Sequence, residues 1–151
     1  MKNTIKLFAM VGILSIVAFT GCKKDKVKGC TDTSSVNFNA DAEEDDGSCR
    51  YEGKQVLWFG AAISDDLINV VGSTTLTFYV DGAIVGSCAA TSFLPSAPTC
   101  GATSAITVVK NLGTSKTKNF TFLVKDDLGN DLWSGTLLFQ ANTCTSYELS
   151  Y

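Results

Sequence analysis

The chain of 151 residues contains no histidine, and this absence excludes several kinds of active site. Ser-His-Asp triads and Cys-His pairs both need an imidazole that accepts the proton of the nucleophile. The familiar mixed cysteine–histidine zinc sites need the same side chain, and no two cysteines have the CxxC spacing. A glycosidase would need two converging carboxylates. The candidates all lie beside turn residues, where solvated side chains are expected: Asp65, Asp66, Asp126, Asp127 and Asp131. We therefore expect the protein not to be an enzyme.

Long apolar segments are also scarce. A transmembrane helix needs about 20 apolar residues, and the longest apolar run here, residues 7–19, is shorter. It follows two lysines, Lys2 and Lys6, and precedes small residues, which is the layout of a secretory signal peptide. The sequence predicts a signal-peptide helix over residues 1–21.

The chain has no basic region. Without residues 1–21, 10 basic and 15 acidic residues remain, which gives a net charge of −5. Seven of the acidic residues lie between Asp32 and Glu52, where Arg50 is the single base. Nucleic-acid binding needs clustered lysine and arginine, so nucleic acid is not an expected partner.

The residues after the apolar run, Phe19-Thr20-Gly21-Cys22, resemble the lipobox of bacterial lipoproteins. The resemblance implies that Cys22 becomes the mature N-terminus and carries a diacylglyceryl group on its sulfur. Two acyl chains give stable membrane anchoring. In such lipoproteins an aspartate directly after the cysteine favours the inner membrane, whereas this chain has Lys23 there. We expect a lipidated tether over residues 22–29 and an outer-membrane location, with the periplasmic or surface leaflet left open.

From Lys54 onward, short apolar runs alternate with glycine, aspartate and asparagine. Residues 74–80 alternate apolar and polar side chains, and the following Asp81-Gly82 pair is typical of a tight β-hairpin. Further strands are predicted at residues 55–59, 83–85, 105–110, 119–125, 131–140 and 145–151. The one helical stretch, residues 65–71, is too short to organise a fold. About seven short strands predict a mainly β protein, a small antiparallel β-sandwich over residues 54–151.

The alternation in these strands also predicts the core of the sandwich. Tyr147 and Leu149 in the last strand are expected to face inward as well, and Tyr79 is expected on the opposite face. The predicted core residues are Phe78, Val80, Phe120, Phe122, Val124, Trp133, Leu137 and Phe139.

Cysteines in an exported protein are expected to form disulfides. With Cys22 lipidated, Cys30 and Cys49 bracket the acidic stretch and close a loop of 19 residues, worth about 3 kcal/mol. We predict that these two pair. The remaining cysteines, Cys88, Cys100 and Cys144, compete for one bond. Strands that simply run up and down would place Cys88 and Cys100 at the same end.

Two parts of the chain resemble known segments. SAPTCGATSAITV, DLWSGTLLF and ANTC resemble the small lipid-anchored β-domains of Bacteroidetes-type envelope lipoproteins. That resemblance implies a Cys100–Cys144 bond and leaves Cys88 unpaired. The acidic stretch, expected as a separate unit over residues 30–53, resembles a cysteine-bracketed module of secreted proteins from the same group. Its matching residues are Gly29 to Asp32, Asn37, Asn39, Asp41-Ala42, Asp45 to Cys49 and Tyr51. Neither resemblance implies an activity.

The acidic stretch also suggests weak calcium binding. Calcium binds six to eight oxygens from carboxylates, amides and carbonyls. Asn37, Asn39 and Asp41 alternate as the first three ligands of an EF-hand loop do, although the rest of that loop does not match. The stretch partly resembles the acidic calcium repeats of thrombospondin-type proteins, in which Asp45 and Asp46 would supply the closing carboxylates. The alternative is a solvated, self-repelling acidic spacer.

Two functions are compatible with these features. The first is a non-enzymatic binding or adhesion module, held at the membrane by its lipid anchor, that binds an envelope protein or a glycan. The second is a structural envelope lipoprotein that has a solvated acidic spacer and no specific ligand. An exposed cluster of aromatic side chains on one sheet or at one loop end would favour the first, and a uniform surface of threonine, serine and lysine would favour the second.

Overall fold

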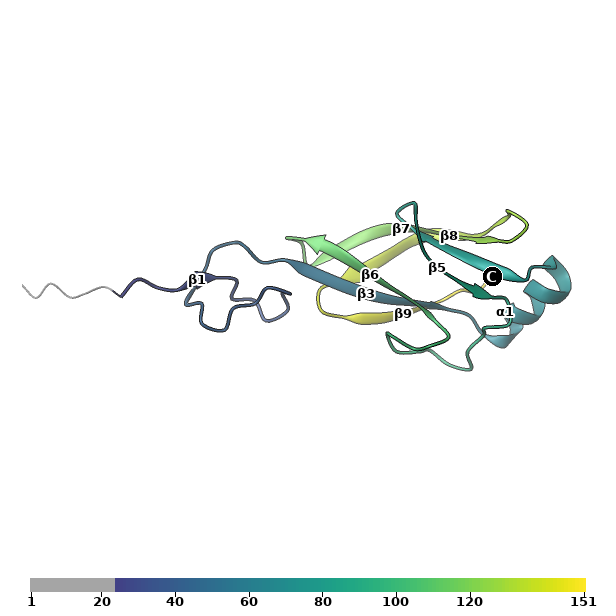
Figure 1. Cartoon of the computed structure of the whole chain (residues 1–151), viewed down its shortest axis with the longest axis horizontal. Coiled ribbons are helices and arrows are strands. Elements are labelled where there is room, and N and C mark those ends of the chain that lie inside the picture. The colour runs from purple at the N-terminus through teal and green to yellow at the C-terminus, as the bar shows by residue number, and fades with distance from the viewer. Residues whose placement is uncertain (1–23) are drawn as a thin grey trace, which may run out of the picture.

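The computed structural model describes residues 24–151. The predictions for the signal peptide and for Cys22 therefore lie outside the described residues. The described part is mainly β and is elongated, with a small disulfide-closed module at one end and a β-sandwich behind it (Figure 1). The elements are β1 Lys28–Gly29, β2 Glu44–Asp45, β3 Tyr51–Trp58, α1 Ala61–Asp66, η1 Leu67–Val71, β4 Thr75–Val80, β5 Ala83–Ala89, β6 Ile106–Gly113, β7 Thr117–Asp126, β8 Asp131–Gln140 and β9 Cys144–Glu148.

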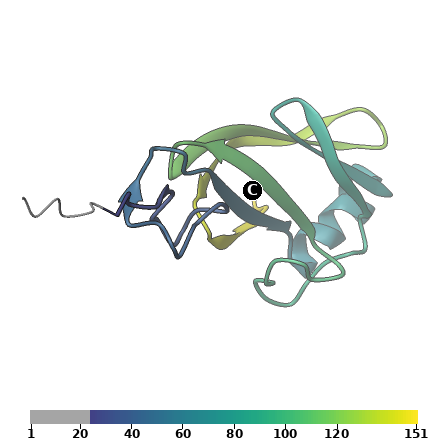
Figure 2. The ribbon, with the colours of Figure 1, turned by 60° about the vertical axis from the view of Figure 1, so that its left-hand side comes forward.

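Seven strands form the sandwich, as predicted. A three-stranded sheet has the order β6-β3-β9, and a four-stranded sheet has the order β5-β4-β7-β8. One pairing differs from the predicted antiparallel arrangement, because β9 runs parallel to β3. After β8 the chain crosses to the other sheet, where Asn142 donates to the carbonyl of Glu52 and Lys54 donates to that of Thr143. It therefore enters beside β3 from the same end and runs in the same direction (Figure 2).

The hairpin between β4 and β5 confirms the prediction made from the Asp-Gly pair. Asp81 and Gly82 have positive φ angles of 56° and 76°. Two consecutive left-handed residues make the turn that matches the twist of paired strands.

The core between the two sheets contains seven of the eight predicted residues in a buried position. The eighth, Trp133, is only partly buried: it packs against the core near the start of β8 and stacks on Tyr151. Tyr147 was also expected to face inward. Its ring packs against that of Phe122, with ring centroids 5.3 Å apart, yet the residue is 39% exposed. Its strand β9 is the edge of a sheet, which leaves one side of the ring open.

The acidic module joins the sandwich without a linker. The strand β3 begins at Tyr51, two residues after Cys49, and continues through the sheet to Trp58. The expected boundary between residues 53 and 54 therefore lies inside a strand. At this point β8 crosses closely over β3, because Gly53 has no side chain to hold the backbone of Gln140 away.

The predicted helical stretch, residues 65–71, lies at the opposite end of the sandwich. It is a short α-helix, α1, that continues directly into a π-helix, η1. Ile63 and Leu67 are buried and hold the pair against the sandwich. Gly72, with a φ of 78°, ends the helical stretch.

Candidate functional site

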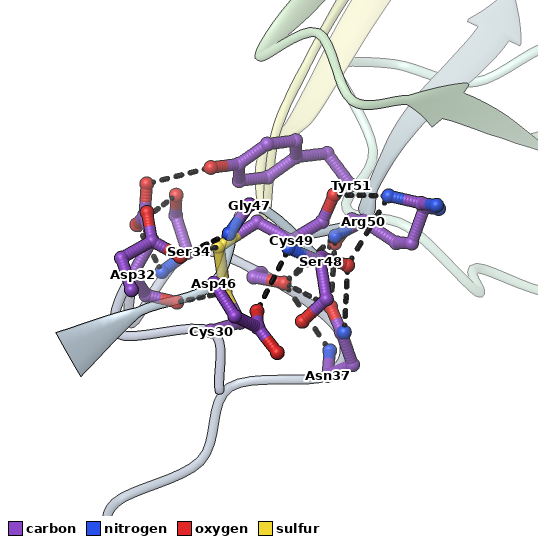
Figure 3. Close-up of a disulfide and its surroundings, with 12 residues drawn as sticks. Cys30, Asp32, Ser34, Asn37, Asp46, Gly47, Ser48, Cys49, Arg50 and Tyr51 are labelled. Atoms are coloured by element: carbon purple, nitrogen blue, oxygen red, sulfur yellow. Dashed lines mark hydrogen bonds between the residues drawn. A yellow bond between two sulfur atoms is a disulfide. The ribbon is translucent and has the colours of Figure 1, made fainter. Parts of the chain in front are cut away.

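The disulfide predicted across the acidic stretch is present, and it forms the centre of a folded module (Figure 3). The sulfurs of Cys30 and Cys49 are 2.03 Å apart, and Cys30 is 1% exposed. Two very short parallel strands, β1 and β2, pair beside it. The stretch is therefore a compact unit in which the chain doubles back on itself, rather than an extended spacer.

The residues predicted to bind calcium lie in the turns of this module. Asn39, Asp45 and Asp46 each accept a hydrogen bond on Oδ1 from a backbone amide two residues further on, at 2.9–3.1 Å. Such Asx turns fix the local backbone. The Asp41 carboxylate is exposed.

Asn37 has a different role, because it connects the two ends of the module. Its Oδ1 accepts hydrogen bonds from the hydroxyl of Ser35 at 2.6 Å and from the amide of Arg50 at 2.8 Å. Its Nδ2 donates to the carbonyl of Ser48 at 2.9 Å. The side-chain oxygen of Asn37, Oδ1, therefore has both lone pairs engaged and is poorly placed to serve as a metal ligand.

The carboxylates of the module point outward rather than toward a common centre. Glu43, Glu44, Asp45 and Asp46 are all exposed. Within residues 24–151, no group of three or more Cys, Asp or Glu side chains is arranged to hold a metal ion. Any calcium site would need the side chains of the module to move together.

A polar cluster that was not predicted from the sequence joins the module to the sandwich. The Asp32 carboxylate accepts a hydrogen bond from the hydroxyl of Tyr51 at 2.8 Å and forms an ion pair with Lys116 of the β6–β7 turn at 2.5 Å. Ser34 donates to the same carboxylate from its amide and its hydroxyl, at 2.9 and 2.7 Å. We call Asp32, Ser34, Tyr51 and Lys116 the junction cluster. A lysine 84 positions after an aspartate carries no local signal that the two will meet.

The junction cluster shifts the ionisation of its members. The hydrogen bond from Lys116, followed by the bonds from Ser34 and Tyr51, holds the pKa of the Asp32 carboxyl well below its usual range. The same carboxylate raises the pKa of Tyr51 and of Lys116. The cluster therefore keeps a negative carboxylate, a protonated lysine and a neutral phenol together over a wide range of pH.

A cleft of about 500 Å³ lies beside the junction, between the module and the turn that connects β8 to β9. Most of its lining residues are polar, but more of the lining surface is apolar than polar, and the disulfide of Cys100 and Cys144 lies on the side of the sandwich. Hydroxyls, one amide and one side chain of each charge line it, together with the apolar Val36. The lining residues are Thr33, Ser34, Ser35, Val36, Glu52, Lys54, Cys100, Asn142, Thr143 and Cys144.

The second disulfide joins Cys100 to Cys144, with sulfurs 1.99 Å apart and 44 positions between them in the sequence. This confirms the pairing implied by the resemblance and excludes the Cys88–Cys100 alternative. Among the described cysteines Cys88 alone is unpaired. Its thiol is half-buried on β5, and burial raises its pKa to about 11.

The aspartates considered for catalysis form hydrogen bonds or ion pairs, or are exposed to solvent. Asp126 and Asp127 bind the segment after η1 and the turn between β7 and β8. Asp131 pairs with Lys125, and Asp65 and Asp66 are exposed on α1.

The chain also contains one SxxK spacing, Ser115 to Lys118, which can supply a serine with a lysine base. The Ser115 hydroxyl instead donates to the carbonyl of Thr117 at 2.7 Å. The Lys118 ammonium lies over the ring of Phe120, 5.0 Å from its centroid. The two side chains are therefore engaged elsewhere.

The fold and the junction together define a class: a small β-sandwich with one internal disulfide, preceded by a disulfide-closed acidic module. No protein-family model, no curated protein and no solved structure matches the chain. The helices of the described part are all too short to cross a membrane.

Proposed function

We propose that this chain is a non-enzymatic lipoprotein of the cell envelope, anchored in the outer membrane through Cys22, that presents its β-sandwich as a binding or adhesion module. The partner is an envelope protein or a glycan. The acidic module is the joint between the anchor and the sandwich. The observation that carries the proposal is that the folded module begins at Val27, five positions after Cys22 in the sequence.

The folded module begins close to the predicted anchor. The carbonyl of Val27 accepts hydrogen bonds from the amides of Glu43 and Glu44, at 2.8 and 3.3 Å. Val27 follows Cys22 by five positions, a length of chain that spans about 17 Å when fully extended. An anchor at Cys22 would therefore hold the acidic module against the membrane surface and direct the opposite end of the sandwich away from it.

The module is also built to transmit this orientation. The strand β3 runs from the module into the sandwich, and the junction cluster connects Asp32 to the β6–β7 turn. A flexible linker would let the sandwich tumble, whereas this joint fixes its direction. A fixed direction is useful to a module that meets its partner at one end.

Fractionation of cells that express the full chain tests the anchor. The wild-type protein is expected in the outer-membrane fraction and should be extracted only by detergent. Cys22→Ser should leave the membrane fraction and keep its unprocessed leader, whereas Cys88→Ser should behave as wild type. Membrane partition of processed Cys22→Ser would show that the anchor lies elsewhere.

The second candidate is a structural envelope lipoprotein without a specific ligand. The exposed carboxylates of Glu43, Glu44, Asp45 and Asp46 favour it, because a solvated acidic surface needs no partner. Deletion of the gene would distinguish the two: altered envelope permeability without loss of adhesion or of a bound partner supports the structural role.

A further inference from the structure

The end of the sandwich farthest from the acidic module carries exposed apolar side chains. The helix α1, which continues into η1, the β7–β8 turn and the C-terminus lie toward that end (Figure 1). Val70 is 78% exposed, Leu128 62%, and Ile68 42%, and the ring of Tyr151 is 72% exposed. We call these four residues the distal patch. Single exposed apolar residues are ordinary on a protein surface, whereas contiguous exposed apolar area marks an interaction site.

The helical stretch exposes two members of the patch for a structural reason. Ile63 and Leu67 are buried and belong to the core. In the π-helix η1, Leu67 is buried, whereas Ile68 and Val70 lie on the outer side. Turns of this kind are rare and occur frequently at functional sites.

Hydrogen bonds fasten the β7–β8 turn, which carries Leu128, to the segment that follows η1. The Thr74 hydroxyl donates to Asp127 at 2.6 Å, and the Ser73 hydroxyl donates to Asp126 at 3.1 Å. The bonds from Thr74 lower the pKa of Asp127 to about 2, so this connection stays in place at neutral pH. A surface held rigid in this way loses little conformational entropy when a partner binds.

Tyr151 extends the patch toward the sandwich. Its ring stacks on Trp133 with centroids 5.4 Å apart and an interplanar angle of 27°. Burial, together with the nearby carboxylate of Asp66, raises the pKa of Tyr151. The aromatic pair therefore lies beside α1, which also carries the acidic residues of this end.

The charge around the distal patch is mainly negative. The segments that form this end, residues 58–75, 126–131 and 148–151, contain six aspartates and glutamates, of which Asp126 is buried and Asp131 pairs with the neighbouring Lys125. Asp65 and Asp66 are exposed on α1, directly before η1. An apolar centre with an acidic rim is complementary to apolar side chains flanked by positive charge.

We propose that the distal patch docks a segment of a partner protein in which apolar side chains are flanked by lysines or arginines. This identifies the class of partner for the proposed function and rests on it, because the anchor directs this end away from the membrane. A second copy of the chain would bring the same acidic rim against itself. An anionic lipid surface would meet the same repulsion.

A binding measurement on the purified, detergent-solubilised lipoprotein tests the proposal. The probe is a short synthetic peptide of leucines flanked by lysines, compared with the same peptide flanked by glutamates. The lysine peptide should bind and the glutamate peptide should not. The double variant Val70→Ser with Leu128→Ser should weaken binding at least about tenfold, and Ile84→Ser, which removes an apolar side chain 65% exposed outside the patch, should leave it unchanged.

Two matched double variants test the contribution of the acidic rim. Asp65→Asn with Asp66→Asn should weaken binding several-fold and reduce its dependence on salt, since screened charges contribute that dependence. Glu43→Gln with Glu44→Gln removes the same charge from the module and should have no effect. Circular dichroism spectra equal to wild type show that each variant is folded.

Three results overturn the proposal: equal binding of both peptides, no binding at about 1 mM peptide, or unchanged affinity in the Val70 and Leu128 double variant. Self-association that this double variant abolishes also overturns it, because the patch would then be a dimer interface. Fractionation of Cys22→Ser is independent of these measurements. A correctly anchored protein that binds no peptide therefore contradicts the docking proposal alone.

Discussion

Asp32 is the residue on which the joint between module and sandwich depends. It is the shared acceptor for Tyr51, Ser34 and Lys116, so a neutral side chain at this position removes the ion pair and weakens the remaining bonds. We expect Asp32→Asn to lower the melting temperature by a few degrees. Asp41→Asn, an exposed change in the same module, should leave the melting temperature unchanged.

The pH dependence of this effect follows from the direction of the pKa shifts. The folded state lowers the pKa of Asp32 below 3.8, so its stabilising effect is present above that pH and is lost as the pH falls toward the folded-state value. It raises the pKa of Lys116 above 10.5, so that contribution is lost only as the pH rises beyond this value. The stability difference between wild type and Asp32→Asn should therefore be flat near neutral pH and shrink below 3.8. Urea unfolding at a series of pH values measures it, and a difference that grows in acid contradicts the assignment.

Cys88 is expected to react slowly with thiol reagents. Its thiol is half-buried, and a pKa of about 11 leaves only about one part in a thousand as the reactive thiolate at pH 8. Iodoacetamide should label the native protein at this position far more slowly than the urea-unfolded protein. The Cys88→Ser variant, which should show no such labelling, identifies the site. Equal rates in the folded and unfolded states would mean that the thiol is exposed.

At the scale of elements, the crossing of β8 over β3 depends on Gly53. A Cβ atom at this position would lie 2.6 Å from the carbonyl oxygen of Gln140, which is backbone and cannot swing aside. Gly53→Ala should therefore cost about 1–3 kcal/mol in the free energy of unfolding. Gly60→Ala is the matched control, because its Cβ would meet its nearest neighbour at 3.6 Å. Chemical unfolding of the two variants measures the difference.

The strands could be predicted from the sequence because their signals are local. The alternation around Phe78 and the Asp81-Gly82 pair fix a strand and its turn within ten residues. The parallel pairing of β9 with β3 depends on the chain crossing between sheets, which no local pattern records.

In the candidate site, too, the local contacts could be predicted from the sequence and the long-range contacts could not. The Cys30–Cys49 pair could be predicted because the two residues bracket one short stretch. The junction cluster could not, because the contact between Asp32 and Lys116 exists only once the sandwich has folded. The distal patch could not be predicted either, because Val70 and Leu128 are 58 positions apart. The hydrogen bonds of Thr74 that bring their segments together are long-range contacts.

At the scale of the whole molecule, the continuous strand β3 couples the module to the sandwich. The strand starts beside the Cys30–Cys49 disulfide and ends next to α1, so loss of either part removes support from the other. We expect one cooperative unfolding transition. Replacing both cysteines by serine should lower the free energy of unfolding by about 3 kcal/mol. Two separate transitions in calorimetry would show that the module folds independently.

This coupling makes calcium binding measurable as a change in the stability of the whole protein. Asp45 and Asp46 each use one carboxylate oxygen in a turn, which leaves the other oxygen free for a cation, whereas the side-chain oxygen of Asn37 is fully engaged. If the module binds calcium with a dissociation constant of about 1 mM, as extracellular modules do, about 10 mM calcium should add about 1.4 kcal/mol to the free energy of unfolding. Magnesium at the same concentration controls for ionic strength. Asp41→Asn with Asp45→Asn should abolish the calcium effect, and Asn37→Ala should instead lower stability equally with and without calcium. An equal response to the two cations, or no response to either, would leave the module as an acidic spacer whose order comes from its disulfide and its turns.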